Sequence, residues 1–390
     1  MKKVKLGEIC DVRDGTHDSP TYIETGYPLV TSKNIVDSKL DLSAVNYISL
    51  NDYKKINERS KVDSGDIIMP MIGTIGNPYL VGEFTEFAIK NVALIKFNRE
   101  QINNKYIFYF LNSEKFKKYI VENNRGGTQK FLSLKDIRNM EINFVSLEEQ
   151  KEIVDRLDKV SSLIEKRKTQ FEKLDQLIKS RFIEMFGAPT ITDKNKSYKP
   201  MTSICEIIDG DRGKNYPKQE EFYENGYCLF LNAKNVTSNG FDFTNCMFIT
   251  KDKDELLRKG KLNRGDVVLT TRGTIGNLAY YSDDVLFDNV RINSGMVILR
   301  MNHEVIDEIF FIEQFKLQLA EIKEKIASGS AQPQLPISTM NKIQMLVPKI
   351  SKQIDFANFA EQIDKSKLAI QKSIDKLETL KKSLMQQYFG

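Results

Sequence analysis

The sequence predicts an α+β fold in which a mostly β domain occurs twice and each copy is followed by a long helix. Residues 65–77 return 200 positions later as residues 265–277, with a shared Gly-Asp, an apolar run and a shared Gly-Thr-Ile-Gly-Asn. A repeat this long indicates a duplicated domain, because solenoid units are far shorter. Two long proline-free stretches, 147–187 and 351–390, carry apolar residues at helical spacing and predict the helices.

The elements follow the same order in both copies. Each copy opens with a short apolar strand closed by Asp-Gly, and continues through a polar loop whose content differs between the copies. A strand, a helix, a Gly-rich loop and a last short strand follow the repeated turn. The expected ranges, first copy then second, are opening strands 4–12 and 204–208, later strands 92–97 and 296–300, helices 105–122 and 305–327, and Gly-rich loops 125–130 and 328–333.

The two long helices each carry a single apolar seam. Ser146 with Glu149 resembles a capping box at the start of the first helix, and Gly187 followed by Pro189 ends it. A helix with one apolar stripe is not stable alone, so we expect the two to pair as an antiparallel coiled coil that separates the domains. The alternative is that each helix folds onto its own domain. The predicted segments are domains at 1–146 and 188–348 and helices at 147–187 and 349–390.

Composition indicates a soluble globular protein. The chain has 390 residues, of which 41% are hydrophobic and 28% charged, enough for two ordinary domains. No apolar run could span a bilayer and the N-terminus has no signal-peptide core, so we expect a cytoplasmic protein. The net charge of +5 permits nucleic-acid binding only through local basic patches.

The sequence offers no convincing catalytic or metal site. The four cysteines lack zinc spacing, and Cys10 and Cys205, at matching positions, are expected to be buried thiols. The two histidines stand in non-equivalent places, and no GxxxxGK[ST] motif is present. Asp66 and Asp266, which directly follow a glycine, are interpreted as turn formers rather than metal ligands.

A binding function remains, and differences between the copies point to its residues. A structural residue tends to stay alike in both copies, whereas a base-reading residue should differ, as Arg272 does from Ile72. Arginine pairs with guanine, and asparagine or glutamine with adenine, in the major groove. For each of these residues, the alternative to a base contact is a solvated charge on the surface. For the repeated turn, the alternatives are that it lies against a phosphate or that it closes a hairpin. The candidate DNA-contacting residues are Arg13, His17, Lys33, Asn34, Thr74, Asn77, Arg125, Thr128, Gln129, Lys130, Arg212, Lys214, Lys234, Asn235, Arg272, Thr274, Asn277, Ser330 and Gln332.

Over its whole length the chain resembles the DNA-specificity subunit of type I restriction–modification systems. The most specific features are the Gly-Asp-hydrophobic-Arg-Gly-Thr-Ile-Gly run at 265–276 and the helix start at 148–153, Glu-Glu-Gln-Lys-Glu-Ile. Both long helices also end in Phe-Gly. The first copy departs from the run at Pro70 and Ile72, and the second helix start is weaker.

The resemblance implies two target-recognition domains that read the halves of an interrupted, asymmetric double-stranded DNA site. It implies a platform of two helices for two methyltransferase subunits, joined by two translocase–nuclease subunits that complete the restriction enzyme. These partners would use S-adenosylmethionine, ATP and Mg²⁺, and this chain would hold no catalytic residue, cofactor or metal. The candidate partner-binding residues of the helices are Leu157, Ile164, Phe171, Ile178, Ile363, Ile370, Leu377 and Leu384.

Two other functions compete with this interpretation. The first is a coiled-coil adaptor whose β-rich domains bind protein, and the second is a standalone nuclease or methyltransferase. The salt dependence of binding distinguishes the adaptor from a DNA-binding protein, because DNA binding weakens steeply as ionic strength rises. Activity of the isolated chain with magnesium or S-adenosylmethionine would indicate the standalone enzyme.

Overall fold

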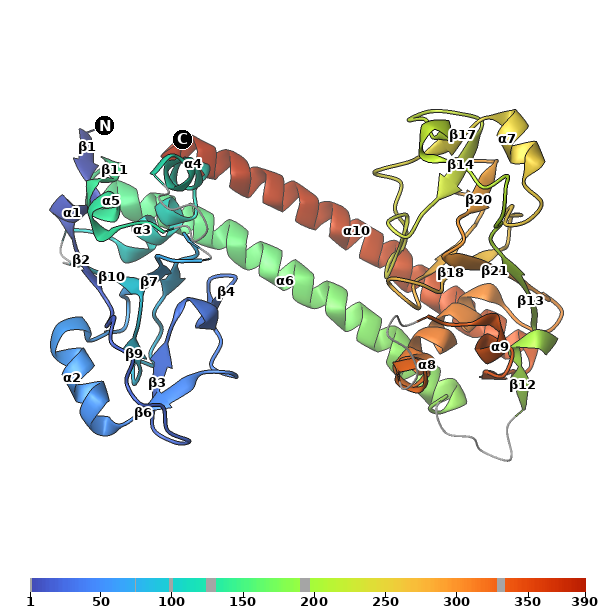
Figure 1. Cartoon of the computed structure of the whole chain (residues 1–390), viewed down its shortest axis with the longest axis horizontal. Coiled ribbons are helices and arrows are strands. Elements are labelled where there is room, and N and C mark those ends of the chain that lie inside the picture. Colours follow the sequence, from blue (N-terminus) through green and yellow to red (C-terminus); the bar gives the residue numbers. More distant parts are fainter. Residues whose placement is uncertain (1, 74, 98–100, 124–130, 190–196, 328–333) are drawn as a thin grey trace. The chain divides into compact units, whose positions relative to one another are not determined.

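A computed structural model describes residues 2–73, 75–97, 101–123, 131–189, 197–327 and 334–390. The chain forms two compact units, one from Met1–Lys168 with Lys372–Gly390 and the other from Thr169–Gln371. The long helices α6 (Leu147–Phe186) and α10 (Ile350–Phe389) each contribute one end to each unit (Figure 1).

The first unit is built on a four-stranded antiparallel sheet in the order β2-β10-β7-β8. A second sheet, β6-β3-β9, pairs β3 parallel with β9. Two short antiparallel pairs, β1-β11 and β4-β5, complete the unit. The bounds are β1 Lys2–Lys5, β2 Cys10–Asp14, β3 Tyr27–Val30, β4 Ile35–Val36, β5 Lys39–Leu40, β6 Asn46–Ile48, β7 Ile67–Pro70, β8 Tyr79–Leu80, β9 Ala88–Ile89, β10 Val92–Phe97 and β11 Glu141–Phe144.

The second unit repeats this topology strand for strand. Its sheets are β13-β21-β18-β19 and β17-β14-β20, again with one parallel pair, β14 with β20, and its short pairs are β12-β22 and β15-β16. The duplication expected from the sequence is therefore confirmed. The bounds are β12 Tyr198–Pro200, β13 Cys205–Asp209, β14 Cys228–Leu231, β15 Val236–Thr237, β16 Gly240–Phe241, β17 Phe248–Ile249, β18 Val267–Thr270, β19 Leu278–Tyr280, β20 Val290–Ile292, β21 Met296–Met301 and β22 Gln344–Leu346.

Shorter helices flank the sheets of each unit. In the first unit they are α1 Leu6–Ile9, α2 Leu50–Ser60, α3 Asn104–Leu111, α4 Glu114–Asn123 and α5 Leu134–Asn139, with the 3₁₀ turn η1 Ser32–Asn34. In the second unit they are α7 Lys251–Leu256, α8 Glu308–Ala327 and α9 Ile337–Met340, with η2 Met201–Ser203 and η3 Gln219–Glu221. None of the helices in these described ranges is long and apolar enough to cross a membrane.

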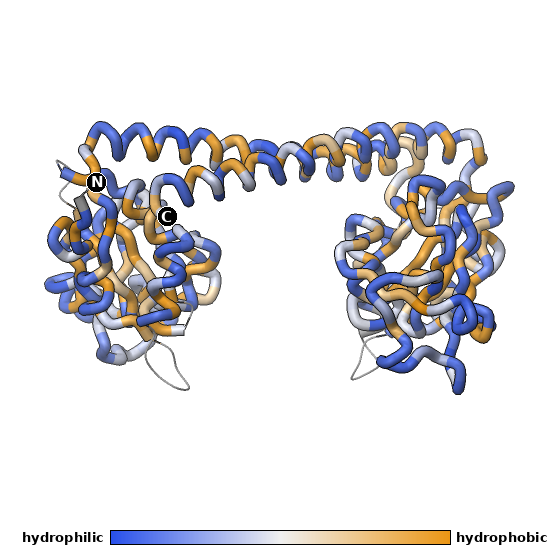
Figure 2. Tube along the Cα trace, turned by 90° about the horizontal axis from the view of Figure 1, so that it is seen from above, coloured by the Kyte–Doolittle hydropathy of each residue, from blue (hydrophilic) through white to orange (hydrophobic). Residues whose placement is uncertain are grey.

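The four-stranded sheet of each unit separates two apolar cores, because alternate residues of a strand point to opposite faces. In β18, Val267 and Leu269 pack on the side of α8 and the long helices. Val268 between them packs toward the β17-β14-β20 sheet, with Leu229. Burial on both faces explains why three consecutive residues of this strand, 267–269, are apolar, and apolar segments run through the interior of each unit (Figure 2).

Two expected elements differ in the structure. The strand expected at 4–12 is interrupted by the single turn α1, which buries Leu6 and carries the chain from the β1-β11 pair to the four-stranded sheet. The helix expected at 105–122 is two helices, because Ser113 caps a new start by accepting the amide of Phe116 at 3.2 Å. Four-residue turns and mid-helix caps do not disturb the apolar spacing from which the elements were predicted.

The long helices pack antiparallel within each unit, as expected. In the first unit Lys168 of α6 lies 3.4 Å from Glu378 of α10, and in the second Asp175 lies 2.6 Å from Lys367. Because residue numbers rise along α6 while they fall along α10, the helices are antiparallel. The alternative in which each helix folds only onto its own domain is excluded. The predicted boundaries of the domains at 146, 187 and 348 stay a prediction, because the compact units divide both helices.

The repeated Phe-Gly ends of the helices have a packing explanation. Phe186 is buried in the second unit, where its ring lies 5.0 Å from that of Phe310. Phe389 is buried in the first unit, where its ring lies 5.1 Å from that of Tyr106. Each long helix thus anchors its last aromatic residue in the core of a unit.

Candidate nucleic-acid interface

The repeated Gly-Thr-Ile-Gly-Asn turn closes a hairpin in each unit. In the second unit the amide of Gly276 donates to the carbonyl of Thr270 at 2.9 Å. Gly276 has a φ of +93°, and a Cβ there would lie 2.2 Å from a methyl carbon of Leu319 in α8. Gly76 has a φ of +79°, with Ile120 of α4 at 2.1 Å in the same role. Hairpin closure and helix packing therefore account for both glycines.

The aspartates after the repeated glycines are structural. Asp266 is buried, accepts the amide of Asn263 at 2.7 Å and pairs with Arg300 at 2.8 Å. Asp66 is buried in the same place and lies 2.5 Å from the Nζ of Lys96. Their interpretation as turn formers is confirmed. Within the ranges given above, no group of three or more His, Cys, Asp and Glu side chains could hold a metal ion.

The buried thiols of Cys10 and Cys205 are also confirmed. Both side chains lie in the apolar cores of their units, on the first strand of the four-stranded sheets. Burial raises the pKa of each thiol to about 12, so both are protonated and unreactive at neutral pH.

Four asparagines that the sequence suggested as DNA contacts hold loops within their units. Their side-chain amides donate to backbone carbonyls in equivalent places: Asn34 to Asp41 at 3.2 Å, Asn235 to Asp242 at 3.0 Å, Asn77 to Ile35 at 3.2 Å and Asn277 to Val236 at 2.9 Å. Asn34 and Asn235 are also buried. These contacts explain why both copies keep the asparagines, and a contact of their side chains with DNA stays a prediction.

Arg272 and Arg212 line one hollow of about 250 Å³ in the second unit. Arg212 lies 3.2 Å from the carboxylate of Asp209 and donates to the carbonyl of Ser294 at 3.3 Å, which positions its guanidinium. The side chain of Arg272 is exposed, and it forms no hydrogen bond or ion pair with any residue that the structure describes. Its guanidinium can therefore present both edges to an acceptor outside the protein.

The equivalent loop of the first unit carries a hydrogen-bonded network around buried Asp14. Nδ1 of His17 lies 2.8 Å from Oδ1 of Asn91, and Nε2 lies 2.8 Å from the carboxylate of Asp14. The bond to Asn91 and the bond to Asp14 raise the pKa of His17 above its ordinary value of 6.5. Arg59 of α2 pairs with the other oxygen of Asp14. Arg13 instead pairs with its neighbour Asp11 at 2.6 Å.

The remaining predicted contacts divide into two groups. Four exposed side chains make no hydrogen bond or ion pair to another described residue, and they stay predictions: Lys33, Lys214, Lys234 and Thr274. Seven lie outside the residues that the structure describes: Thr74, Arg125, Thr128, Gln129, Lys130, Ser330 and Gln332.

Two segments of the chain, residues 1–175 and 194–381, match the family model described as the type I restriction modification DNA specificity domain. The chain belongs to this family. Among its relatives is a protein of Methanocaldococcus jannaschii whose name assigns it as the specificity subunit of the type I restriction enzyme MjaX. The two are 23% identical over 99% of this chain and 94% of the relative.

Solved structures share the fold of this specificity-domain protein. The crystal structure of the S subunit of a type I restriction–modification system from M. genitalium has a TM-score of 0.57 at 17% identity, over 100% of this chain and 96% of its own. A chain from a study of complex assembly and conformational transition of the type I system has a TM-score of 0.58 at 18% identity, over 100% and 97%. The mixed helix and strand architecture with two paired long helices is therefore that of the family.

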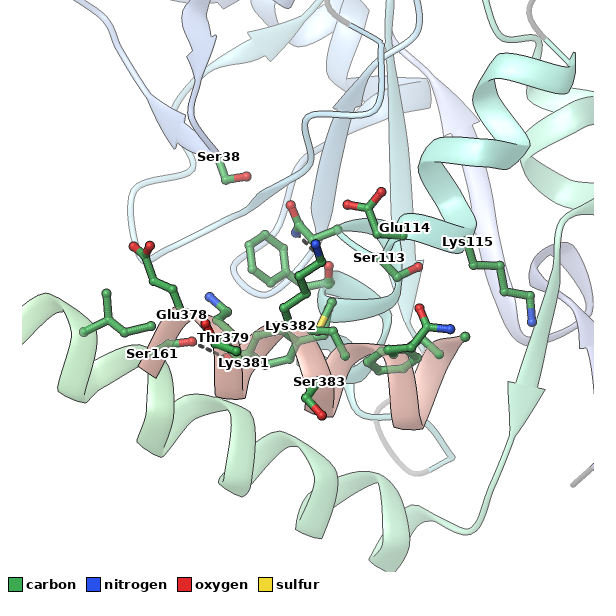
Figure 3. A pocket seen from close by; sticks show the side chains of 18 of the residues that line it. Ser38, Ser113, Glu114, Lys115, Ser161, Glu378, Thr379, Lys381, Lys382 and Ser383 are labelled. Atoms are coloured by element: carbon green, nitrogen blue, oxygen red, sulfur yellow. Dashed lines mark hydrogen bonds between the residues drawn. The ribbon is translucent and has the colours of Figure 1, made fainter. Parts of the chain in front are cut away.

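A larger hollow of about 810 Å³ lies in the first unit of the specificity protein, where the end of α10 and the middle of α6 meet α3 and α4 (Figure 3). Side chains of both charges line it, including Lys381, Lys382, Glu114 and Glu378. Burial lowers the pKa of Lys381. Because the charges are mixed, this hollow lacks the basic character of a DNA-binding surface.

The helix residues suggested as partner contacts are fully or partly buried by the chain itself. Leu157, Ile164 and Ile178 are buried, and Phe171, Ile363, Ile370, Leu377 and Leu384 are half-buried. Their apolar seam is buried where α6 and α10 pack against each other in each unit. This packing explains why both helices are amphipathic. A contact of these side chains with a partner subunit stays a prediction.

Sequence reasoning missed Arg59, which lines a hollow of about 540 Å³ together with His17. It lies outside the repeated motif, near the end of α2, and so carried no signal of its own. Its distance from the repeated glycines could nevertheless have identified it. Both Arg59 and Lys259 are basic and stand six positions before the Gly of Gly65-Asp66 and Gly265-Asp266.

Proposed function

We propose that this chain is the non-catalytic DNA-recognition subunit of a type I restriction–modification complex. Each domain reads one half of an interrupted DNA site, and the site is asymmetric because the domains differ. The observation that carries the proposal is that both copies keep the same internal contacts at the repeated turn, whereas their exposed cations differ. Arg272 stands where the first copy has Ile72, and Arg212 lies in a loop of unrelated content.

The proposal extends to the partners. Two methyltransferase subunits and two translocase–nuclease subunits bind the specificity chain, and the exposed polar faces of α6 and α10 form the platform for the methyltransferases. Those subunits use S-adenosylmethionine, ATP and Mg²⁺. This chain supplies no catalytic group and selects the sequence at which the partners act.

Long-read methylation mapping tests the function directly. The chain is expressed with its methyltransferase partner in cells that lack other adenine methylation, and a strain without the chain serves as the control. We expect N6-methyladenine at one bipartite, asymmetric motif that disappears without the chain. Methylation that is unchanged by deletion of the chain would contradict the proposal.

The adaptor alternative is tested by salt. If the domains bind DNA through phosphate contacts, the affinity of the complex falls roughly 10³-fold or more between 50 and 200 mM salt when about six phosphates are contacted. Affinity that is indifferent to salt and to DNA would favour protein-binding domains.

A further inference from the structure

Counted back from the repeated Gly-Asp, Arg59 and Lys259 stand at the same position, although Arg59 lies in α2 and Lys259 lies after the end of α7. The carbonyl oxygen of Arg59 accepts a hydrogen bond from Nη1 of Arg13 at 3.2 Å. The carbonyl oxygen of Lys259 accepts one from Nη1 of Arg291 at 2.7 Å. An arginine of the adjoining strands thus fixes the backbone at both positions, while both side chains are exposed.

In each unit this position adjoins the variable loop that follows the first strand of the four-stranded sheet. In the first unit Arg59 and His17 of that loop line the same hollow, together with Lys55, although Asp18 and Asp52 also line it. In the second unit the loop residue Asp211 accepts the amide of Lys259 at 3.3 Å. A ligand that reaches the variable loop therefore meets a basic side chain at the same place in either domain.

A purely structural role does not explain why both positions are basic. Arg59 pairs with buried Asp14, but the side chain of Lys259 has no ion pair among the residues that the structure describes. The neighbouring shared lysines show the contrast, because Lys261 pairs with buried Asp254 at 2.6 Å and Lys61 lies 3.5 Å from Asp63. What Arg59 and Lys259 share is an outward positive charge.

We propose that Arg59 and Lys259 are a matched pair of phosphate contacts, one for each half-site. The inference rests on the proposed function and adds a division of labour to it. Phosphates are the same at every base pair, so a residue that contacts them can be kept in both copies, whereas a residue that reads bases must change. The pair positions each domain on the duplex, and the variable loops beside it select the sequence.

The test measures DNA binding by the complete complex of the chain with its methyltransferase. The variants Arg59→Ala and Lys259→Ala are compared with wild type on the methylated motif and on random DNA, over a range of salt. We expect each variant to weaken binding to both DNAs by the same factor, roughly three- to tenfold, and to lower the slope of log affinity against log salt by about one. The methylated motif stays unchanged.

Lys54→Ala is the matched control, since Lys54 is exposed on the same helix as Arg59 and its place in α7 is taken by the acidic Glu255. We expect no change in its salt slope. Arg59→Lys and Lys259→Arg keep the charge and should keep the slope. If Arg59→Ala loses its fold because buried Asp14 keeps only His17 as a charged partner, Lys259→Ala carries the test alone.

Three results have distinct meanings. Unchanged affinity and slope in a complex that still methylates its motif would overturn the phosphate contacts and leave the proposed function standing. A changed motif in either variant would overturn them in favour of base contacts. Absence of any motif in the wild-type complex would instead remove the proposed function.

Discussion

The two domains fill one equivalent space with different chemistry: the space lies between α2 and β9 in the first unit and between α7 and β20 in the second. In the first unit Ala88 of β9 is buried, and the rings of Tyr27 and Tyr53 stack beside it with centroids 4.1 Å apart. In the second unit Arg291 of β20 is buried and pairs with buried Asp254 of α7, which stands where α2 has Tyr53. The backbone frame is duplicated, but the side chains that stabilise it are not.

The comparison teaches which residues a duplicated domain is free to change. Contacts that close a turn or hold a loop are kept, as at Asp66 and Asp266, because the backbone shape depends on them. A core position can change completely if its neighbours change with it. Surface cations differ with little cost to the fold, and under the proposed function they are the positions that would give the domains different DNA targets.

The largest expected effect comes from breaking the buried ion pair of the second domain. Arg291→Ala leaves Asp254 buried, with Lys261 at 2.6 Å as its remaining partner, and removes the donors to the carbonyls of Leu257 and Lys259. We expect the free energy of unfolding of this domain to fall by about 3 kcal/mol. Chemical denaturation of the full chain measures the change.

The first domain supplies the matching control for that prediction. The double variant Arg291→Ala with Asp254→Tyr introduces the pair of residues found at Ala88 and Tyr53, and it should recover part of the lost stability because no charge is left buried. If the double variant were less stable than Arg291→Ala alone, the residue pair of the first domain could not replace that of the second, and the prediction would be wrong.

A smaller effect is expected where the domains differ at the surface. Arg272→Ile gives the second domain the residue of the first, Ile72, and removes a guanidinium with no described partner. We expect one position of the second half-site to relax in a methylation map, with a loss of about 1–3 kcal/mol in discrimination between bases. The first half-site, read by the other domain, should be unaffected. Equal weakening on every sequence would identify Arg272 as a phosphate contact instead.

The fold of the two domains could be predicted because its sequence pattern occurs twice in the chain. The turn at Gly276, the aspartate before it and the amphipathic long helices each leave a local pattern, and the structure confirms them. The pairing of Arg291 with Asp254 leaves none, because the two residues are 37 positions apart and only the fold brings them together.

The site was harder to predict for two physical reasons. Short polar side chains serve loops and ligands equally well, so Asn34 and Asn235 were expected at DNA although both bond to backbone in the folded chain. A long basic side chain such as that of Lys259 becomes a candidate contact only once the structure shows that it makes no ion pair with a described residue.

The smallest expected effect concerns the charge beside Asp14 and its counterpart Asp209. In the second domain the variable loop supplies the permanent charge of Arg212. In the first domain the loop supplies His17, which titrates, and Arg59 of α2 adds a permanent charge. Bonds to Asn91 and Asp14 raise the pKa of His17 above 6.5, so the ion pair is complete below pH 6.5 and is lost as pH rises through the raised pKa.

The expected result is a weak pH dependence of DNA binding that belongs to the first domain alone. Between about pH 6 and pH 8 the affinity of the complex should fall by about threefold or less, the effect of one exposed charge. His17→Arg should remove this dependence, because it gives the loop the permanent charge found in the second domain. Imidazole resonances of the chain, which has two histidines, report the titration, with His303→Gln to assign them. A midpoint for His17 at or below 6.5 would contradict the network around Asp14 and with it the difference between the two loops.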